Sequence, residues 1–238
     1  PLLGVLPGTG GLTRLVDKRK IRRDHADFFC TTEEGLLASR ALKWGLVDHI
    51  APPSKYKELL ESRAATIAYM TKKKPGNTGI KLNSIDRKIE NDTISYQNLR
   101  ITIDRKMRCA QLLVRGPQSD CPGELKEMIS LGSQFWPLQV MRELEDAVLH
   151  LRFNEPETST WLIKSHGDSD RVLSFNEALW RHRETWFISE INLFIERVLK
   201  RFDISARSII TAIGPNSCFH GPFFELALIA DQTFMLLG

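Results

Sequence analysis

The chain has 238 residues, of which 42% are hydrophobic and 26% are charged, a composition typical of folded globular proteins rather than disordered ones. Its net charge of +4 is modest, so charge alone does not indicate nucleic-acid binding, and a phosphate-bearing ligand suits it equally well. Neither an apolar run of the roughly 18 residues that cross a bilayer nor a secretory leader is recognisable. We therefore expect a cytoplasmic protein that binds no membrane.

The first predicted elements follow a glycine-rich loop. Four glycines and a proline fall within residues 4–11, which predicts a turn followed by a helix. Thr32, with two glutamates after it, is a typical N-cap, and Gly45 is a typical left-handed helix end. We expect a helix between these two positions and a short strand at residues 46–47.

A second helix and then a linker are predicted next. Apolar residues recur at helical spacing from Ser54 to Met70. The composition then changes to lysine, asparagine, glycine, proline and aspartate, which is typical of a linker. The sequence thus predicts three parts, namely residues 1–70, a linker at 71–95, and a second part at 96–238.

The second part is predicted to alternate strands and helices. Residues 99–104 and 109–114 are expected to form a hairpin, and residues 138–151 an amphipathic helix. Ser174 and Glu177 form the pattern of a capping box, which predicts one long helix from there to Phe202. The remaining predictions are strands at 161–163, 208–213 and 233–237 and a buried helix at 223–230 that follows Pro222. This order predicts an α/β fold.

Stretches in both parts of the chain resemble the crotonase superfamily of acyl-CoA enzymes. Residues 3–14 and 41–47 (ALKWGLV) resemble elements late in the crotonase module, whereas residues 212–231 resemble its middle, the oxyanion loop and the helix carrying ELA. Late elements thus precede a middle element. The resemblance implies a fragment of two incomplete tandem modules of the crotonase-like ββα spiral fold, the first lacking its beginning and the second its end.

Within the superfamily, phrases such as LLGVLPGTGGLTR and DKRKIRRD resemble the benzoyl-CoA-dihydrodiol lyase family. That resemblance implies ring opening of 2,3-epoxybenzoyl-CoA with water, giving 3,4-dehydroadipyl-CoA semialdehyde and formate, without a metal or a redox cofactor. It also implies an acyl-CoA substrate, contact with the missing remainder of the parent chain, a homo-oligomer and no nucleic acid. Family chemistry rests on two backbone N–H groups that hold the thioester oxygen and on two glutamates.

The oxyanion loop of the second module is the first candidate site. By resemblance, Glu225 matches the first family glutamate, and His220, Gly221 and Pro222 form the oxyanion loop. The family takes its second oxyanion N–H from the position of Pro222, and proline has none. Losing one such donor costs about 3 kcal/mol of transition-state stabilisation. We therefore favour a buried structural carboxylate over a catalytic role for Glu225, and a hydrogen-bonded structural role for His220.

The first module offers candidates for substrate binding. The resemblance places its catalytic glutamates upstream of Pro1, so Gly8, Gly10 and Gly11 are either the loop beneath that active site or an ordinary strand-to-helix turn. Residues 18–23 form a basic run whose Arg19 and Arg22 could bind the phosphates of coenzyme A. The favoured interpretation of this run is a solvated helix face paired with nearby aspartates.

Three hypotheses follow for the parent protein. The first is the ring-cleaving lyase, with a second module that is degraded and serves packing. The second is another acyl-CoA hydratase or isomerase of the superfamily. The third is a non-catalytic crotonase-like binding protein.

Overall fold

The computed structural model describes residues 10–71 and 79–237. The chain divides into two compact units, Pro1–Pro75 and Gly76–Gly238. This division falls inside the range where the linker is predicted. Part of that range is regular structure, since strands β1 (Lys88–Glu90) and β2 (Thr93–Ser95) lie within residues 71–95.

The described part of unit 1 is helical. Its elements are α1 (Gly11–Thr13), the π-helical turn η1 (Arg14–Lys18), α2 (Arg23–Thr31), α3 (Ala38–Lys43) and α4 (Pro53–Met70). The left-handed helix end at Gly45 is confirmed, with φ of 79°, and the N–H of Leu46 donates to the carbonyl of Ala41 at 2.9 Å. The predicted start was wrong, because Thr32 is the C-cap of α2 and α3 begins at Ala38. The strand expected at residues 46–47 is not formed there.

Helix α4 confirms the second predicted helix almost residue for residue. Proline at its first position fits a helix start, since the missing N–H is not needed there. None of its residues is buried within unit 1, and Ile67 and Tyr69 are 59% and 92% exposed.

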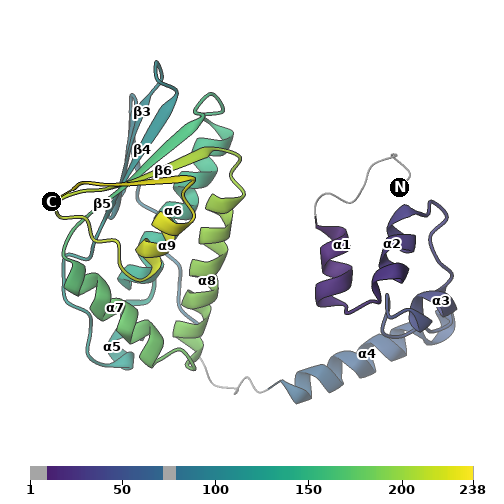
Figure 1. Ribbon diagram of the computed structural model, residues 1–238. Coiled ribbons are helices and arrows are strands. Elements are labelled where there is room, and N and C mark those ends of the chain that lie inside the picture. The colour runs from purple at the N-terminus through teal and green to yellow at the C-terminus, as the bar shows by residue number, and fades with distance from the viewer. Residues whose placement is uncertain (1–9, 72–78, 238) are drawn as a thin grey trace. The chain divides into compact units, whose positions relative to one another are not determined.

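Unit 2 is built on one seven-stranded sheet (Figure 1). Its strands lie side by side in chain order, antiparallel from β1 to β4 and parallel from β4 to β7. After β1 and β2, the strands are β3 (Leu99–Asp104), β4 (Cys109–Arg115), β5 (Thr160–His166), β6 (Ser208–Ile213) and β7 (Gln232–Met235). The predicted hairpin is β3 and β4, and the α/β class is confirmed.

Helices connect the parallel strands, as parallel pairing requires. Elements α5 (Leu125–Leu131), η2 (Gly132–Gln134) and α6 (Trp136–Phe153) join β4 to β5, α7 (Ser169–Arg181) and α8 (Trp186–Asp203) join β5 to β6, and α9 (Pro222–Leu228) joins β6 to β7. The single long helix predicted from Ser174 was wrong. Two helices stand there, and Asp168 is the N-cap of the first, where its side chain accepts from the N–H groups of Asp170 and Arg171.

The core of unit 2 lies between the sheet and its helices. Alternate strand residues such as Ile101, Leu112 and Trp161 are buried at one face of the sheet, where they meet the apolar stripe of α6, represented by Leu144 and Val148. Side chains of a strand alternate between its two faces, and the apolar side chains of α6 form one stripe, so each element buries one side only. Among residues 10–71 and 79–237, no helix is both long and apolar enough to cross a membrane.

Candidate functional site

Loops at the carboxyl ends of β4, β5 and β6 meet at one edge of the sheet, where ligands bind in many open α/β proteins. The N–H of Gly116 donates to the carbonyl of His166 at 2.9 Å, and the N–H of Gly167 donates to the carbonyl of Asn216 at 3.0 Å. A Cβ atom on Gly116 would lie 3.3 Å from the sulfur of buried Cys218. The loops therefore lie close against one another, with little room for a side chain at Gly116.

The predicted oxyanion turn follows the loop after β6 at this edge of the sheet. Gly221 has φ of 50°, and Pro222 begins α9. The N–H of His220 donates to the Cys218 carbonyl, and the N–H of Phe223 donates to the His220 carbonyl at 3.0 Å. Pro222 has no N–H, and the N–H groups of His220 and Phe223 are used within the turn. The position expected to supply the second donor to a thioester oxygen therefore supplies none.

Aromatic side chains of α6, α7 and α9 pack together beside Pro222. The ring centroid of Trp136 lies 5.2 Å from that of Phe175 and 5.3 Å from that of Phe223. The cavity that Pro222 and Asn176 line together with these rings has a volume of only about 10 Å³. That is at most the room of a single water molecule, so a thioester does not fit there.

Glu225 points away from this edge. Helix α9 turns Phe223 and Leu226 toward the core, which leaves Glu225 exposed. It lines a shallow hollow of about 400 Å³ beside α8, together with Glu196 and Lys200. The favoured interpretation of Glu225 as a buried carboxylate was therefore wrong. His220 is also exposed.

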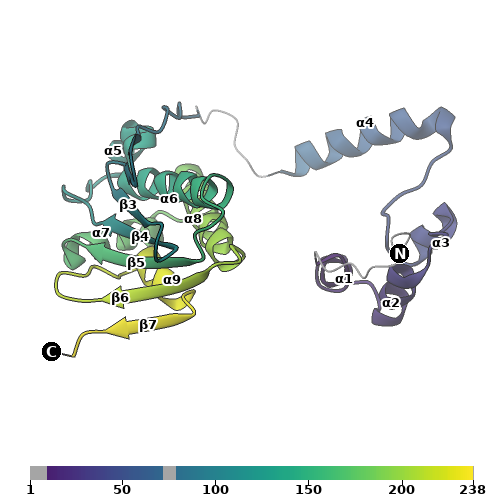
Figure 2. The same ribbon diagram turned by 90° about the horizontal axis from the view of Figure 1, so that it is seen from above.

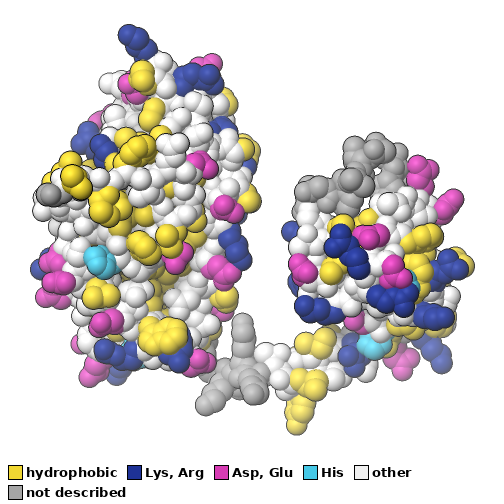
Figure 3. All heavy atoms as spheres, in the orientation of Figure 1, with side chains coloured by type: hydrophobic (Ala, Val, Ile, Leu, Met, Phe, Trp, Pro, Cys, Tyr) yellow, Lys and Arg dark blue, Asp and Glu magenta, His cyan; other side chains and the backbone are white. Residues whose placement is uncertain are grey.

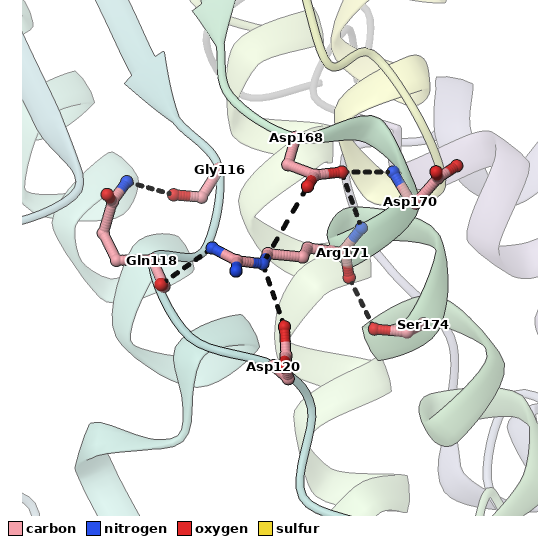
Figure 4. A network of polar contacts seen from close by, with 7 residues as sticks. All are labelled: Gly116, Gln118, Asp120, Asp168, Asp170, Arg171 and Ser174. Atoms are coloured by element: carbon pink, nitrogen blue, oxygen red, sulfur yellow. Dashed lines mark hydrogen bonds and ion pairs between the residues drawn. The ribbon is translucent and has the colours of Figure 1, made fainter.

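A polar network secures the start of α7 at the same edge (Figure 4). The Nε of Arg171 donates to Asp120 at 2.9 Å, and its Nη1 donates to the carbonyl of Gln118 at 2.9 Å. Asp168 accepts from the backbone N–H of Arg171 at 3.2 Å. Charge-assisted bonds of this kind fix geometry. The network holds the loop after β4 against the helix after β5, and the sequence reasoning missed it, although Asp168 followed by Ser and Asp is itself an N-cap signal.

A second residue that the sequence reasoning missed is Glu143 on α6. It is 3% exposed, and its carboxylate accepts from the backbone N–H of Asn98 at 2.8 Å and from the Asn98 side chain at 3.1 Å. Burial raises the pKa of Glu143 above its ordinary value, and the two bonds from Asn98 oppose that rise. Glu143 lines a polar hollow of about 540 Å³ with Tyr96 and Arg142. These two hydrogen bonds hold the turn before β3 against α6.

The candidate residues of unit 1 do not form one site. Gly10 has φ of 90° and caps α1, Gly11 begins that helix, and Gly8 lies outside the described residues. Arg19 forms an ion pair with Asp48 at 3.1 Å and donates to the carbonyl of Gly45 at 2.9 Å.

Arg22 is also paired within unit 1. It lies 2.6 Å from Asp24, and this hydrogen bond lowers the pKa of Asp24 to about 2. Arg23 pairs with Asp27 at 3.1 Å. Three arginines of the basic run are thus paired with aspartates, Arg22 and Arg23 with the expected ones and Arg19 with Asp48. The expectation of a helix face was wrong, because residues 19–22 lie between η1 and α2. Arg19 and Arg22 as phosphate ligands remain a prediction.

Comparison with known proteins gives one curated relative. The chain is 41% identical over 236 residues to benzoyl-CoA-dihydrodiol lyase of Aromatoleum evansii, an alignment that covers 99% of this chain and 42% of that protein. The chain therefore spans less than half the length of this relative. The predicted resemblance to that family is confirmed, and no family model matches the chain.

Solved structures give weaker similarity. An enoyl-CoA hydratase from Geobacillus kaustophilus HTA426 is 17% identical, with 59% of this chain and 46% of that chain covered and a TM-score of 0.38. An enoyl-CoA hydratase/isomerase from Marinobacter aquaeolei is 13% identical, with 58% and 48% covered and a TM-score of 0.36.

Proposed function

We propose, from the similarity of this chain to benzoyl-CoA-dihydrodiol lyase, that a protein containing it is a carbon-carbon lyase of the crotonase superfamily acting on a CoA thioester. Its reaction is the opening of the ring of 2,3-epoxybenzoyl-CoA with water, which gives 3,4-dehydroadipyl-CoA semialdehyde and formate. The observation that carries this proposal is an identity that extends over nearly the whole of the chain rather than over one motif.

Within that protein, unit 2 is a non-catalytic copy of the module. Three features support this role. The N–H groups of His220 and Phe223 are used inside the turn, Pro222 has none, and the cavity that Pro222 lines holds about 10 Å³. Glu225 faces solvent rather than that space. An oxyanion site needs preorganised donors aimed at the thioester oxygen, and the position of Pro222 supplies none.

The chemistry therefore belongs to a module completed by residues outside this chain. Two carboxylates there would position water and move protons, and two backbone N–H groups would hold the thioester oxygen. No metal and no redox cofactor enters this proposal. Coenzyme A takes part as a portion of the substrate.

The test is an assay of the full-length protein with 2,3-epoxybenzoyl-CoA, with formate release as the readout. We expect formate from the wild type and from the Glu225→Gln variant at equal rates. Hydration of ordinary enoyl-CoA without formate would replace the proposal with the hydratase/isomerase hypothesis. Loss of formate release in Glu225→Gln, with the fold retained by circular dichroism, would overturn the non-catalytic role of unit 2.

A further inference from the structure

One face of the unit 2 sheet is left open by the helices. Figure 2 shows α6 and α8 on one side of the sheet, and the buried strand residues face that side. Because strand side chains alternate, residues such as Arg100, Leu113 and Lys164 stand on the opposite side. We call the outward side chains of β3 to β6 the open face. Leu113, Leu162 and Ile210 on it are only partly buried.

The strand register gathers cations on the open face. Leu113 pairs with Arg100 on β3 and with Lys164 on β5, so one cation stands on each side of this leucine. Two strand spacings place their Cα atoms roughly 10 Å apart. Arg115 lies two residues beyond Leu113 and pairs with His166.

These cations are not neutralised by their neighbours. Within residues 10–71 and 79–237, no ion pair is formed by Arg100, Arg115 or Lys164, whereas arginines elsewhere, such as Arg171, contact carboxylates. The one acidic side chain described on the open face is Asp104, at the far end of β3, where it accepts from the N–H of Met107 at 2.8 Å. The carboxyl half of the open face therefore carries unbalanced positive charge.

We propose that the open face is a docking surface for an acidic polypeptide. Its apolar centre of Leu113, Leu162 and Ile210 would meet apolar residues of the partner, while carboxylates around them would meet Arg100 and Lys164. This arrangement of an apolar centre with a charged rim is that of protein interfaces, in which rim charges steer association.

The alternatives fit the open face less well. Single-stranded RNA requires successive aromatic side chains for stacking, and the outward residues of β3 to β6 include none apart from His166. A second copy of this chain would bring cations against cations, because Asp104 is the one acid there. Small ligands prefer concave sites, and this is the flat side of a sheet.

The test measures binding of a fluorescent peptide that alternates glutamate and leucine, with its glutamine counterpart as the reference probe. The main variant is R100E/K164E, and the milder pair R100Q/K164Q serves if charge reversal disturbs the fold. The control is K18E/K20E, which changes the net charge by the same amount as R100E/K164E. We expect the acidic peptide to bind the wild type and to lose about tenfold in affinity with either open-face pair, about 1.4 kcal/mol. The K18E/K20E control should bind as the wild type does, and binding should weaken with salt.

Several results would overturn the proposal. An equal loss in K18E/K20E would mean that net charge alone attracts the peptide. Tighter binding of a single-stranded RNA oligonucleotide that is lost in the open-face variants would assign the surface to RNA. Self-association that R100Q/K164Q abolishes would assign it to a second copy, and equal binding of the glutamine peptide would remove the role of charge.

Discussion

Replacement of Gly167 by alanine should destabilise unit 2 strongly. Gly167 has φ of 152°, a backbone conformation that residues with a Cβ rarely adopt. A Cβ atom there would lie 3.0 Å from both the backbone nitrogen and the Cα of Gly116. Both obstacles are backbone, so no side chain can rotate away to relieve the contact.

The unfavourable φ and the close backbone contact together set the size of the effect. An unfavourable φ costs on the order of 1–3 kcal/mol, and the close contact adds to it, so we expect a loss of roughly 2–4 kcal/mol in the free energy of unfolding. For a domain of about 150–250 residues, each kcal/mol lowers Tm by roughly 2–4 °C. The midpoint of Gly167→Ala should therefore fall by about 5–15 °C.

Urea unfolding followed by circular dichroism measures this loss directly. The midpoint should fall while the m-value stays the same, because the surface exposed on unfolding does not change. Gly123→Ala is the matched control, since a Cβ there meets no atom within 4 Å and φ is not positive, and it should stay within about 0.5 kcal/mol of the wild type. Equal midpoints for the two variants would refute the close packing of the β4 and β5 loops.

Two further predictions concern Glu143 and Trp136. Because the pKa of Glu143 is raised, its carboxyl group keeps its proton to a higher pH in the folded state than in the unfolded chain. The contribution of Glu143 to the free energy of unfolding therefore falls as pH rises above the ordinary pKa of 4.5. This decline should be absent in Glu143→Gln, and parallel pH profiles of the unfolding free energy in wild type and variant would contradict the prediction. Trp136→Ala should cost up to about 3 kcal/mol because it removes a partly buried ring that packs on Phe175 and Phe223, whereas Trp180→Ala, at a side chain 69% exposed, should stay near the wild type in the same urea titration. Similar losses in both would argue against this aromatic packing.

Sequence patterns were sufficient where an element carries its own periodicity. Helix α6 shows its apolar stripe in the sequence, β3 and β4 show alternation around a turn, and Gly45 marks a helix end, because all of these depend on neighbours a few residues away. The family resemblance was likewise carried by local phrases. The break between α7 and α8 was missed, because the apolar pattern continues across it while Asp168 starts the helix earlier than Ser174.

The candidate site depended on contacts that no local pattern contains. Pro222 alone predicted a turn without one N–H donor, and this follows from covalent chemistry. That the rings of Trp136 and Phe175 pack beside Pro222 was decided by tertiary contacts, since both residues stand far from it in the sequence. The outward direction of Glu225 was decided by which side of α9 packs on the core.

Residue type and short-range spacing thus determined the α/β class and most helices and strands of this protein, and short sequence phrases carried its resemblance to a known family. Tertiary structure alone decided which loops meet at the carboxyl edge, how little room they leave, and which sheet face stays open. The physical reason is that propensity and periodicity are properties of a few neighbouring residues, whereas access and burial arise only when distant segments pack together.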